Sequence, residues 1–276
     1  NHTMPNFKTV QRNVKSFYIS ILVFMILLFS FINNANCKQI NHHQFNKRNF
    51  NDNNQNQQRL LVISLGGFRH DFISNYNLKH LSKFAQQSAS APYLNPQFTT
   101  QSFPNHWSMA TGSFVENHGI VADKFFDPIF HEYFGPNKYH DPKWWNQTGL
   151  EPIWHTSVQQ GIKTACLNWP GCEAFNDDAS ELYLKSPYSD VNMLSIEGKL
   201  NEALRLIKNE NFKFILVYHN QPDSIAHKYG INSAEFNVTL NQLDEAWGRF
   251  MYDLSKLGLD EAHNFNLVLV SDHGLT

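Results

Sequence analysis

The chain has 276 residues, with 22 Lys and Arg against 24 Asp and Glu, so its formal net charge is −2. This balance excludes the strongly basic character that supports nucleic-acid binding, and we expect no nucleic-acid polymer as a partner. A hydrophobic fraction of 42% and an aromatic fraction of 14% exclude a globally disordered chain. The three cysteines, Cys37, Cys166 and Cys172, are too few for a disulfide scaffold, and their spacing matches no zinc finger.

The N-terminal segment has the pattern of a targeting signal. Lys8, Arg12 and Lys15 precede a short apolar run at residues 17–32. A basic region followed by a short apolar stretch predicts that residues 1–38 form a secretory signal peptide. An uncleaved signal anchor is the alternative, and it would place the protein on a membrane through this segment. A buried helix is disfavoured because the run has no polar face.

Residues 39–58 are rich in Asn and Gln and cannot bury apolar surface. We therefore expect a disordered linker there, followed by a folded domain at residues 59–276. The sequons at Asn146 and Asn237 become potential glycosylation sites if the chain enters the secretory pathway. The expected location is extracellular or at the cell-surface membrane.

Within residues 59–276, buried apolar runs alternate with amphipathic segments. In chain order, the pattern predicts a strand at 60–64, helices at 78–88, 102–111 and 152–160, a strand at 163–168, a helix at 196–209, a strand at 212–218, a helix at 233–257 and a strand at 266–271. This alternation predicts an α/β fold in which a mostly parallel sheet has helices on both faces. Ligands of such sheets bind at the carboxyl ends of the strands.

Two of the strongest predicted strands are followed by an Asp/His pair. Asp223 and His227 come after the strand at 212–218, and Asp272 and His273 come directly after the last strand. Carboxylate and imidazole ligands together suit Zn²⁺. Each pair alone is also compatible with a surface ion pair or a helix cap, but two pairs at equivalent sheet positions favour a metal site.

Ser102 offers a hydroxyl nucleophile at the start of a predicted helix. The helix N-terminus would stabilise an oxyanion and a bound phosphate, and a metal ion would activate the hydroxyl further. The alternative interpretation of these residues alone is an N-cap serine.

Several ordered motifs between Leu60 and Thr276 resemble the ectonucleotide pyrophosphatase/phosphodiesterase family, within the alkaline phosphatase superfamily. They are LVISLGGFRHDFI (61–73), TTQSFPNHWSMATGSFVENHGIVADKFFDP (99–128), PKWWNQ (142–147), EPIW (151–154), NWPGCE (168–173), QPDSIAHKYG (221–230) and VSDHG (270–274). The ENHGIVA stretch is most similar to the branch of family member five. The resemblance implies an alkaline-phosphatase-like fold, two zinc ions and a covalent intermediate on a Thr or Ser.

Carried over by position, the resemblance assigns Ser102 as the nucleophile, which also contacts zinc. It places Asp223 and His227 at one zinc ion, and Asp272 and His273 at the other. It also implies that Tyr188 stacks on the nucleotide base, for which a surface aromatic is the alternative.

The sequence departs from the family pattern within these motifs. Gly66 stands where the family has an Asp that ligates the second zinc, and glycine has no side chain to replace it. Asp123 stands where a family Asn donates to the phosphate, and an ionised carboxylate would repel a phosphate. Ser102 replaces the usual Thr but keeps the hydroxyl. The family domain continues beyond Thr276 and has a further His ligand there, so residues 59–276 are expected to be the N-terminal part of a catalytic domain.

The leading hypothesis is zinc-dependent hydrolysis of nucleotide phosphodiester or pyrophosphate bonds outside the cell. The alternative is a catalytically impaired or inactive family member that acts as a surface binding protein, because Gly66 and Asp123 replace site residues. Phosphomonoester hydrolysis is a second enzymatic alternative, which the NWPG and HKYG segments disfavour. The sequence does not choose between nucleotide, dinucleotide and lysophospholipid substrates.

Overall fold

The computed structural model describes residues 58–175, 183–188, 194–260 and 264–276. The predicted signal segment at 1–38 and nearly all of the predicted linker at 39–58 lie outside these residues. No helix within the described ranges is both long enough and apolar enough to cross a membrane.

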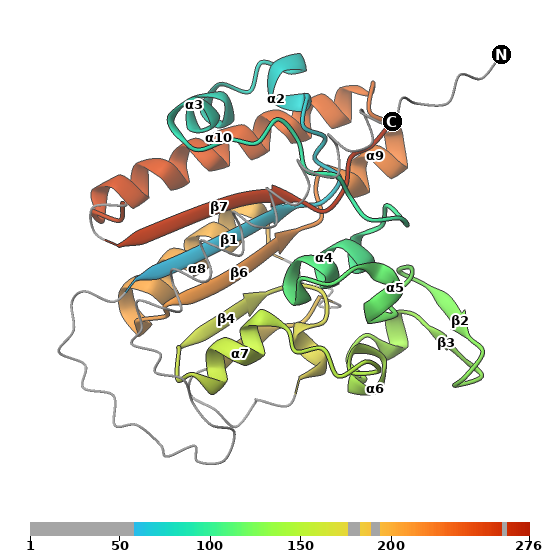
Figure 1. The fold of residues 1–276 in the computed structure, drawn as a ribbon. Helices are drawn as coiled ribbons and strands as arrows, with labels where there is room; N and C mark the ends of the chain where they lie inside the picture. Colours follow the sequence, from blue (N-terminus) through green and yellow to red (C-terminus); the bar gives the residue numbers. More distant parts are fainter. Residues whose placement is uncertain (1–57, 176–182, 189–193, 261–263) are drawn as a thin grey trace, which may run out of the picture.

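A five-stranded sheet forms the centre of the fold, and every pairing in it is parallel (Figure 1). Its spatial order is β5-β4-β6-β1-β7. The strands are β1 (Arg59–Leu65), β4 (Thr164–Leu167), β5 (Tyr183–Ser186), β6 (Phe214–His219) and β7 (Phe265–Ser271). The predicted parallel α/β architecture is thus confirmed, and β5 is a strand that the sequence pattern missed.

Strand β6 begins two residues later than predicted. The preceding helix ends at Glu210, its C-cap residue Asn211 has φ 58°, and the Phe212 N–H bonds back to the Leu206 carbonyl. Phe212 is 3% exposed, so its apolar character reflects burial in the turn rather than strand pairing.

Side chains alternate across the central strand β1. Leu61, Ile63 and Leu65 enter one core, whereas Leu60 and Val62 enter the other. The first core is mainly aliphatic. It packs against α2 (Phe72–Asn75), α3 (Lys79–Gln87), α8 (Ile196–Glu210), α9 (Asp223–Tyr229) and α10 (Ala234–Lys256).

The second core is aromatic and covers the opposite face of the sheet. It contains most of the fully buried tryptophans: Trp107, Trp144, Trp145, Trp154 and Trp169. The covering elements are α4 (Ser102–Thr111), α5 (Val115–His118), α6 (Pro142–Trp145), α7 (Ile153–Gln159), the 3-10 turns η1 (Pro136–Lys138) and η2 (Cys172–Ala174), and the antiparallel hairpin of β2 (Phe125–Asp127) and β3 (Glu132–Phe134). In Figure 1, α4, α5, α6 and the β2–β3 hairpin lie at the lower right, and α7 lies below β4.

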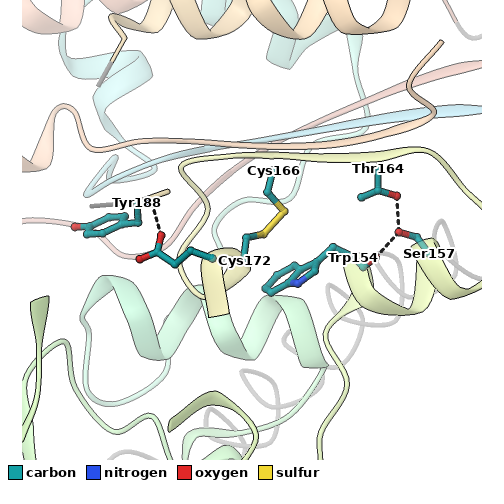
Figure 2. Close-up of a disulfide and its surroundings, with 7 residues drawn as sticks. Trp154, Ser157, Thr164, Cys166, Cys172 and Tyr188 are labelled. Atoms are coloured by element: carbon teal, nitrogen blue, oxygen red, sulfur yellow. Dashed lines mark hydrogen bonds between the residues drawn. A yellow bond between two sulfur atoms is a disulfide. The ribbon is translucent and has the colours of Figure 1, made fainter. Parts of the chain in front are cut away.

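A disulfide joins Cys166 on β4 to Cys172 on η2, a pairing that the sequence left open. Figure 2 shows it beside Trp154 and Ser157 of α7. Ser157 also hydrogen-bonds to the Thr164 hydroxyl at 2.7 Å. The covalent link and this hydrogen bond both hold the aromatic layer against β4.

Candidate active site at the carboxyl ends of the strands

The predicted site residues Ser102, Asp223, Asp272 and His273 gather where β6 and β7 end. Asp223 begins α9 after β6, and Asp272 and His273 follow β7. Because β1 pairs in parallel with both strands, their carboxyl ends meet at one edge of the sheet. The N-terminus of α4 brings Ser102 to the same edge.

Ser102 is the first residue of α4 and is 5% exposed. The N-cap position belongs to Gln101, whose own side chain does not cap the helix, so the interpretation of Ser102 as an N-cap serine is wrong. The Ser102 Oγ lies 3.4 Å from His273 Nε2 and 3.4 Å from the Tyr218 hydroxyl. The hydroxyl therefore points toward the polar residues at the strand ends.

The inner pair, Asp272 and His273, is buried and firmly held. Asp272 Oδ1 accepts the backbone N–H groups of Gly67 and of His273, each at 2.9 Å. Asp272 Oδ2 lies 3.6 Å from His273 Nε2. His273 Nδ1 lies 3.1 Å from the Gly274 carbonyl, and a carbonyl can only accept, so Nδ1 donates. The other ring nitrogen consequently faces Ser102.

The outer pair, Asp223 and His227, lies on one face of α9. His227 Nε2 is 3.3 Å from Asp223 Oδ1, and their side chains are 72% and 17% exposed. The same carboxylate oxygen lies 4.0 Å from His273 Nε2, which links the two pairs. Burial raises the pKa of Asp223, while His273 and His227 oppose that shift.

The donors at this edge have the chemistry that zinc requires, because they combine carboxylate and imidazole groups. Asp223 Oδ1 and Asp272 Oδ2 are buried, and neither accepts a hydrogen bond from the described part of the chain. Buried carboxylate oxygens in that state suit a cation. No group of three His, Cys, Asp or Glu side chains among the described residues is placed to hold one ion.

Gly66 contributes no side chain to this edge of the sheet. A Cβ at this position would lie 2.7 Å from the Tyr218 hydroxyl and 3.3 Å from the Asn220 Cα. The Tyr218 hydroxyl therefore occupies the space next to Gly66 from which a carboxylate would project. Burial raises the pKa of Tyr218 well above its usual value, so the hydroxyl keeps its proton.

Asp123 lies beside the first turn of α4. Its Oδ1 accepts the backbone N–H of Phe103 at 2.8 Å, and the Tyr139 hydroxyl donates to its carbonyl at 3.1 Å. Burial raises the pKa of the Asp123 carboxyl. The carboxyl thus accepts the hydrogen bond of one N-terminal amide of α4, directly next to Ser102.

Tyr188 packs into the aromatic core at the edge of the site. Its ring lies 5.8 Å from that of Tyr218 with an angle of 23°, and 4.8 Å from that of Phe103 in an edge arrangement. It is partly buried, so the alternative of a free surface aromatic is wrong. Two further residues of this site, Tyr218 and His106, were not predicted from the sequence.

His106 lies one helical turn after Ser102 and is fully buried. Burial lowers the pKa of its imidazole, and the nearby Asp272 carboxylate opposes that effect. Its spacing of four residues from Ser102 within the PNHW segment was the available signal, because residues four apart share a helix face.

Comparison with known proteins identifies the family. Residues 60–276 match the family described as "Type I phosphodiesterase / nucleotide pyrophosphatase", and the chain belongs to it. The resemblance found in the sequence motifs is thus confirmed.

The relatives include human "Bis(5'-adenosyl)-triphosphatase ENPP4", which is 35% identical over 222 residues and is matched over 79% of this chain and 48% of its own length. Mouse "Ectonucleotide pyrophosphatase/phosphodiesterase family member 7" is 29% identical over 231 residues, covering 80% of this chain and 51% of its own. The solved structure of murine ENPP5 matches with a TM-score of 0.69 and 28% identity, covering 79% of this chain and 57% of that one. This chain spans about half the length of the curated relatives it matches.

Proposed function

We propose that the full-length protein hydrolyses a phosphodiester or pyrophosphate bond of a nucleotide, with Ser102 as the nucleophile. The observation that carries this proposal is that Ser102, the first residue of helix α4, directs its hydroxyl toward His273, whose imidazole lies next to Asp223 and Asp272. A helix N-terminus favours a bound phosphate next to the nucleophile. The family description and the triphosphatase name of the human relative support this substrate class.

In this proposal Ser102 Oγ forms a bond to phosphorus while the bond to the leaving group breaks, and water later releases the nucleotide from the serine. Asp223 and His227 would hold one zinc ion, and Asp272, His273 and Ser102 the other. Zinc bound there would lower the pKa of the hydroxyl and offset charge on the phosphate. Tyr188 would present its ring to the base.

Replacement of the nucleophile tests the proposal. In the full-length protein supplied with Zn²⁺, Ser102→Ala should reduce the hydrolysis of diadenosine triphosphate to background. Ser88→Ala is the matched control, because Ser88 is exposed at the end of α3, and it should leave turnover unchanged. Retained activity in Ser102→Ala would overturn the assignment of the nucleophile.

A second candidate function is nucleotide binding with impaired or absent catalysis, favoured by Gly66 and Asp123. Asp123→Asn separates the candidates, because Asn can still accept the Phe103 N–H while its amide donates to phosphate. Gly66→Asp restores the missing carboxylate but must displace the Tyr218 hydroxyl. Increased turnover in either variant supports a weakened enzyme. AMP binding measured by calorimetry, with no turnover in any variant, supports the binding protein.

We also propose that the protein enters the secretory pathway, as the N-terminal pattern predicts. The Cys166–Cys172 disulfide suits an oxidising compartment, and the sequon residues Asn146 and Asn237 are both exposed. Expression in a eukaryotic secretory host should give a product that becomes smaller after removal of N-glycans. An unmodified product retained in the cytosol would contradict this location.

A further inference from the structure

His106 connects three of the elements that build the site. Its Nδ1 lies 2.7 Å from the Ser102 carbonyl oxygen on α4, and its Nε2 lies 2.9 Å from Ser64 Oγ on β1. Nδ1 also lies 3.7 Å from Asp272 Oδ2, after β7. All three contacts are shielded from solvent, because His106 and Ser64 are 0% exposed and Asp272 is 2% exposed.

The hydrogen-bond partners of the imidazole determine which of its two nitrogens donates and which accepts. A backbone carbonyl is only an acceptor, so Nδ1 must carry a hydrogen and donate to Ser102. In the neutral ring, Nε2 then has a free lone pair and accepts the Ser64 hydroxyl. The ring is held edge-on by Trp169 and Tyr218, with centroid distances of 4.8 Å and 4.4 Å. The imidazole therefore has one defined orientation.

We propose that His106 is a positioning residue, which fixes the first turn of α4 and thereby the direction of the Ser102 hydroxyl. The position of a serine oxygen depends on one torsion angle, χ1, and on the backbone of the residue itself, so a shift of that backbone moves the oxygen. His106 holds this backbone through the Ser102 carbonyl. The imidazole is itself anchored to Ser64 on β1, which lies between β6 and β7. The inference rests on the proposed function in taking Ser102 as the nucleophile.

Two amide variants separate positioning from packing. Asn at 106 places its Nδ2 where the imidazole has Nδ1, so it can still donate to Ser102. Gln at 106 places its Nε2 near the position of the imidazole Nε2, so it can reach Ser64 but not the carbonyl. Both variants remove the ring, and both lose its contacts with Trp169 and Tyr218.

Kinetics of the full-length, zinc-supplied protein on diadenosine triphosphate give the first measurement. His106→Gln should lower kcat about 10- to 100-fold with KM unchanged, because a misplaced nucleophile loses its reactive geometry. His106→Asn should recover most of that loss. An equal loss of kcat in the two variants would overturn the inference in favour of a packing role.

Crystal structures of the two variants without substrate give a measurement that does not require turnover. Ser102 Oγ should stay within about 0.5 Å of its wild-type position in His106→Asn and leave it in His106→Gln. An unmoved Ser102 in His106→Gln overturns the inference whether or not the protein is active. An inactive wild-type protein with a displaced Ser102 in His106→Gln overturns the proposed function alone.

Ser64→Ala serves if His106→Gln does not fold, since it keeps the ring and its packing. The imidazole then loses one of its two anchors, and kcat should fall about 3- to 10-fold, again with KM unchanged. An unchanged kcat in Ser64→Ala would overturn the proposed series of hydrogen bonds from Ser64 on β1 through His106 to Ser102.

Discussion

The two Asp/His pairs of the site differ in how the protein holds them. The inner pair, Asp272 and His273, has side chains that are 0% and 6% exposed, and Asp272 accepts two backbone hydrogen bonds. The outer pair, Asp223 and His227, contains a histidine that is 72% exposed. The inner pair is therefore part of the folded framework as well as a candidate ligand set. The outer pair can adjust to a ligand at little cost to the fold.

The greatest difference in the free energy of unfolding is expected between replacements of the two carboxylates, Asp272 and Asp223. Asp272→Ala should lower the free energy of unfolding by about 2–6 kcal/mol, because each buried donor left without an acceptor costs about 1–3 kcal/mol. Asp223→Ala should be neutral or slightly stabilising, since it removes a buried carboxylate oxygen that accepts no hydrogen bond from the described residues. Denaturant unfolding of the full-length variants measures both. Equal losses would show that the two pairs are held alike.

A second prediction extends the comparison to β6, which leads into the outer pair. Lys199 is 1% exposed and donates to the Tyr218 carbonyl at 2.7 Å, and burial lowers its pKa to about 7. Between pH 7 and about 10.4 the unfolded chain binds more protons at this residue than the folded chain, so stability should rise with pH.

The expected gain over that range is about 2–4 kcal/mol, and it should be absent in Lys199→Met. His219 faces the same lysine, but its pKa is lowered to about 3, so it titrates in a different range. Unfolding curves at pH 7 and pH 10 measure the difference. A wild-type slope equal to that of Lys199→Met would contradict the lowered pKa.

Zinc binding should differ between the two pairs. Free Zn²⁺ at tenfold above its dissociation constant should stabilise the full-length protein by about 1.4 kcal/mol per site. Because Gly66 supplies no carboxylate to the inner pair, we expect one tightly held ion and a much weaker second one. Metal analysis after dialysis checks the stoichiometry. Two equally tight ions would show that another group replaces the missing carboxylate.

The smallest effect is expected at His227. His227→Ala should change the free energy of unfolding without metal by less than about 0.5 kcal/mol, because the side chain is exposed and its ion pair is screened. The same variant should markedly reduce the stabilisation by Zn²⁺. A large loss of stability without metal would place His227 in the framework, with the inner pair.

The sequence predicts the longer helices on the aliphatic side of the sheet well, because they are long enough to show periodicity, whereas the short α2 and α9 were not predicted. Helices α8 and α10 begin at Ile196 and Ala234, directly after the capping serines Ser195 and Ser233, and both lie within about a residue of the predicted bounds. The aromatic side contains α5, α6 and the β2–β3 hairpin, which are too short for a periodic pattern. These elements were missed because aromatic packing, rather than local spacing, determines them.

The site divides in the same way. The pairs at Asp223 and Asp272 were found because polar residues after buried parallel strands must meet at one sheet edge. His106 and Tyr218 were missed because their importance depends on burial against residues far away in the sequence, such as Ser64 and Asp272. The substrate class, the division of the ligands between two zinc ions and the role of Tyr188 come from the family resemblance.

The outer edge of β7 bears on how the protein behaves in isolation. Within the described ranges, β7 pairs only with β1, so the backbone groups of its other edge are unpaired, and its residues Leu267, Val268, Leu269 and Val270 are only partly buried on the two faces of the sheet. An apolar strand with unpaired backbone groups is a template for another strand. Residues 59–276 expressed alone should therefore self-associate and precipitate with rising concentration. A soluble preparation requires a polypeptide segment or a partner that covers this edge.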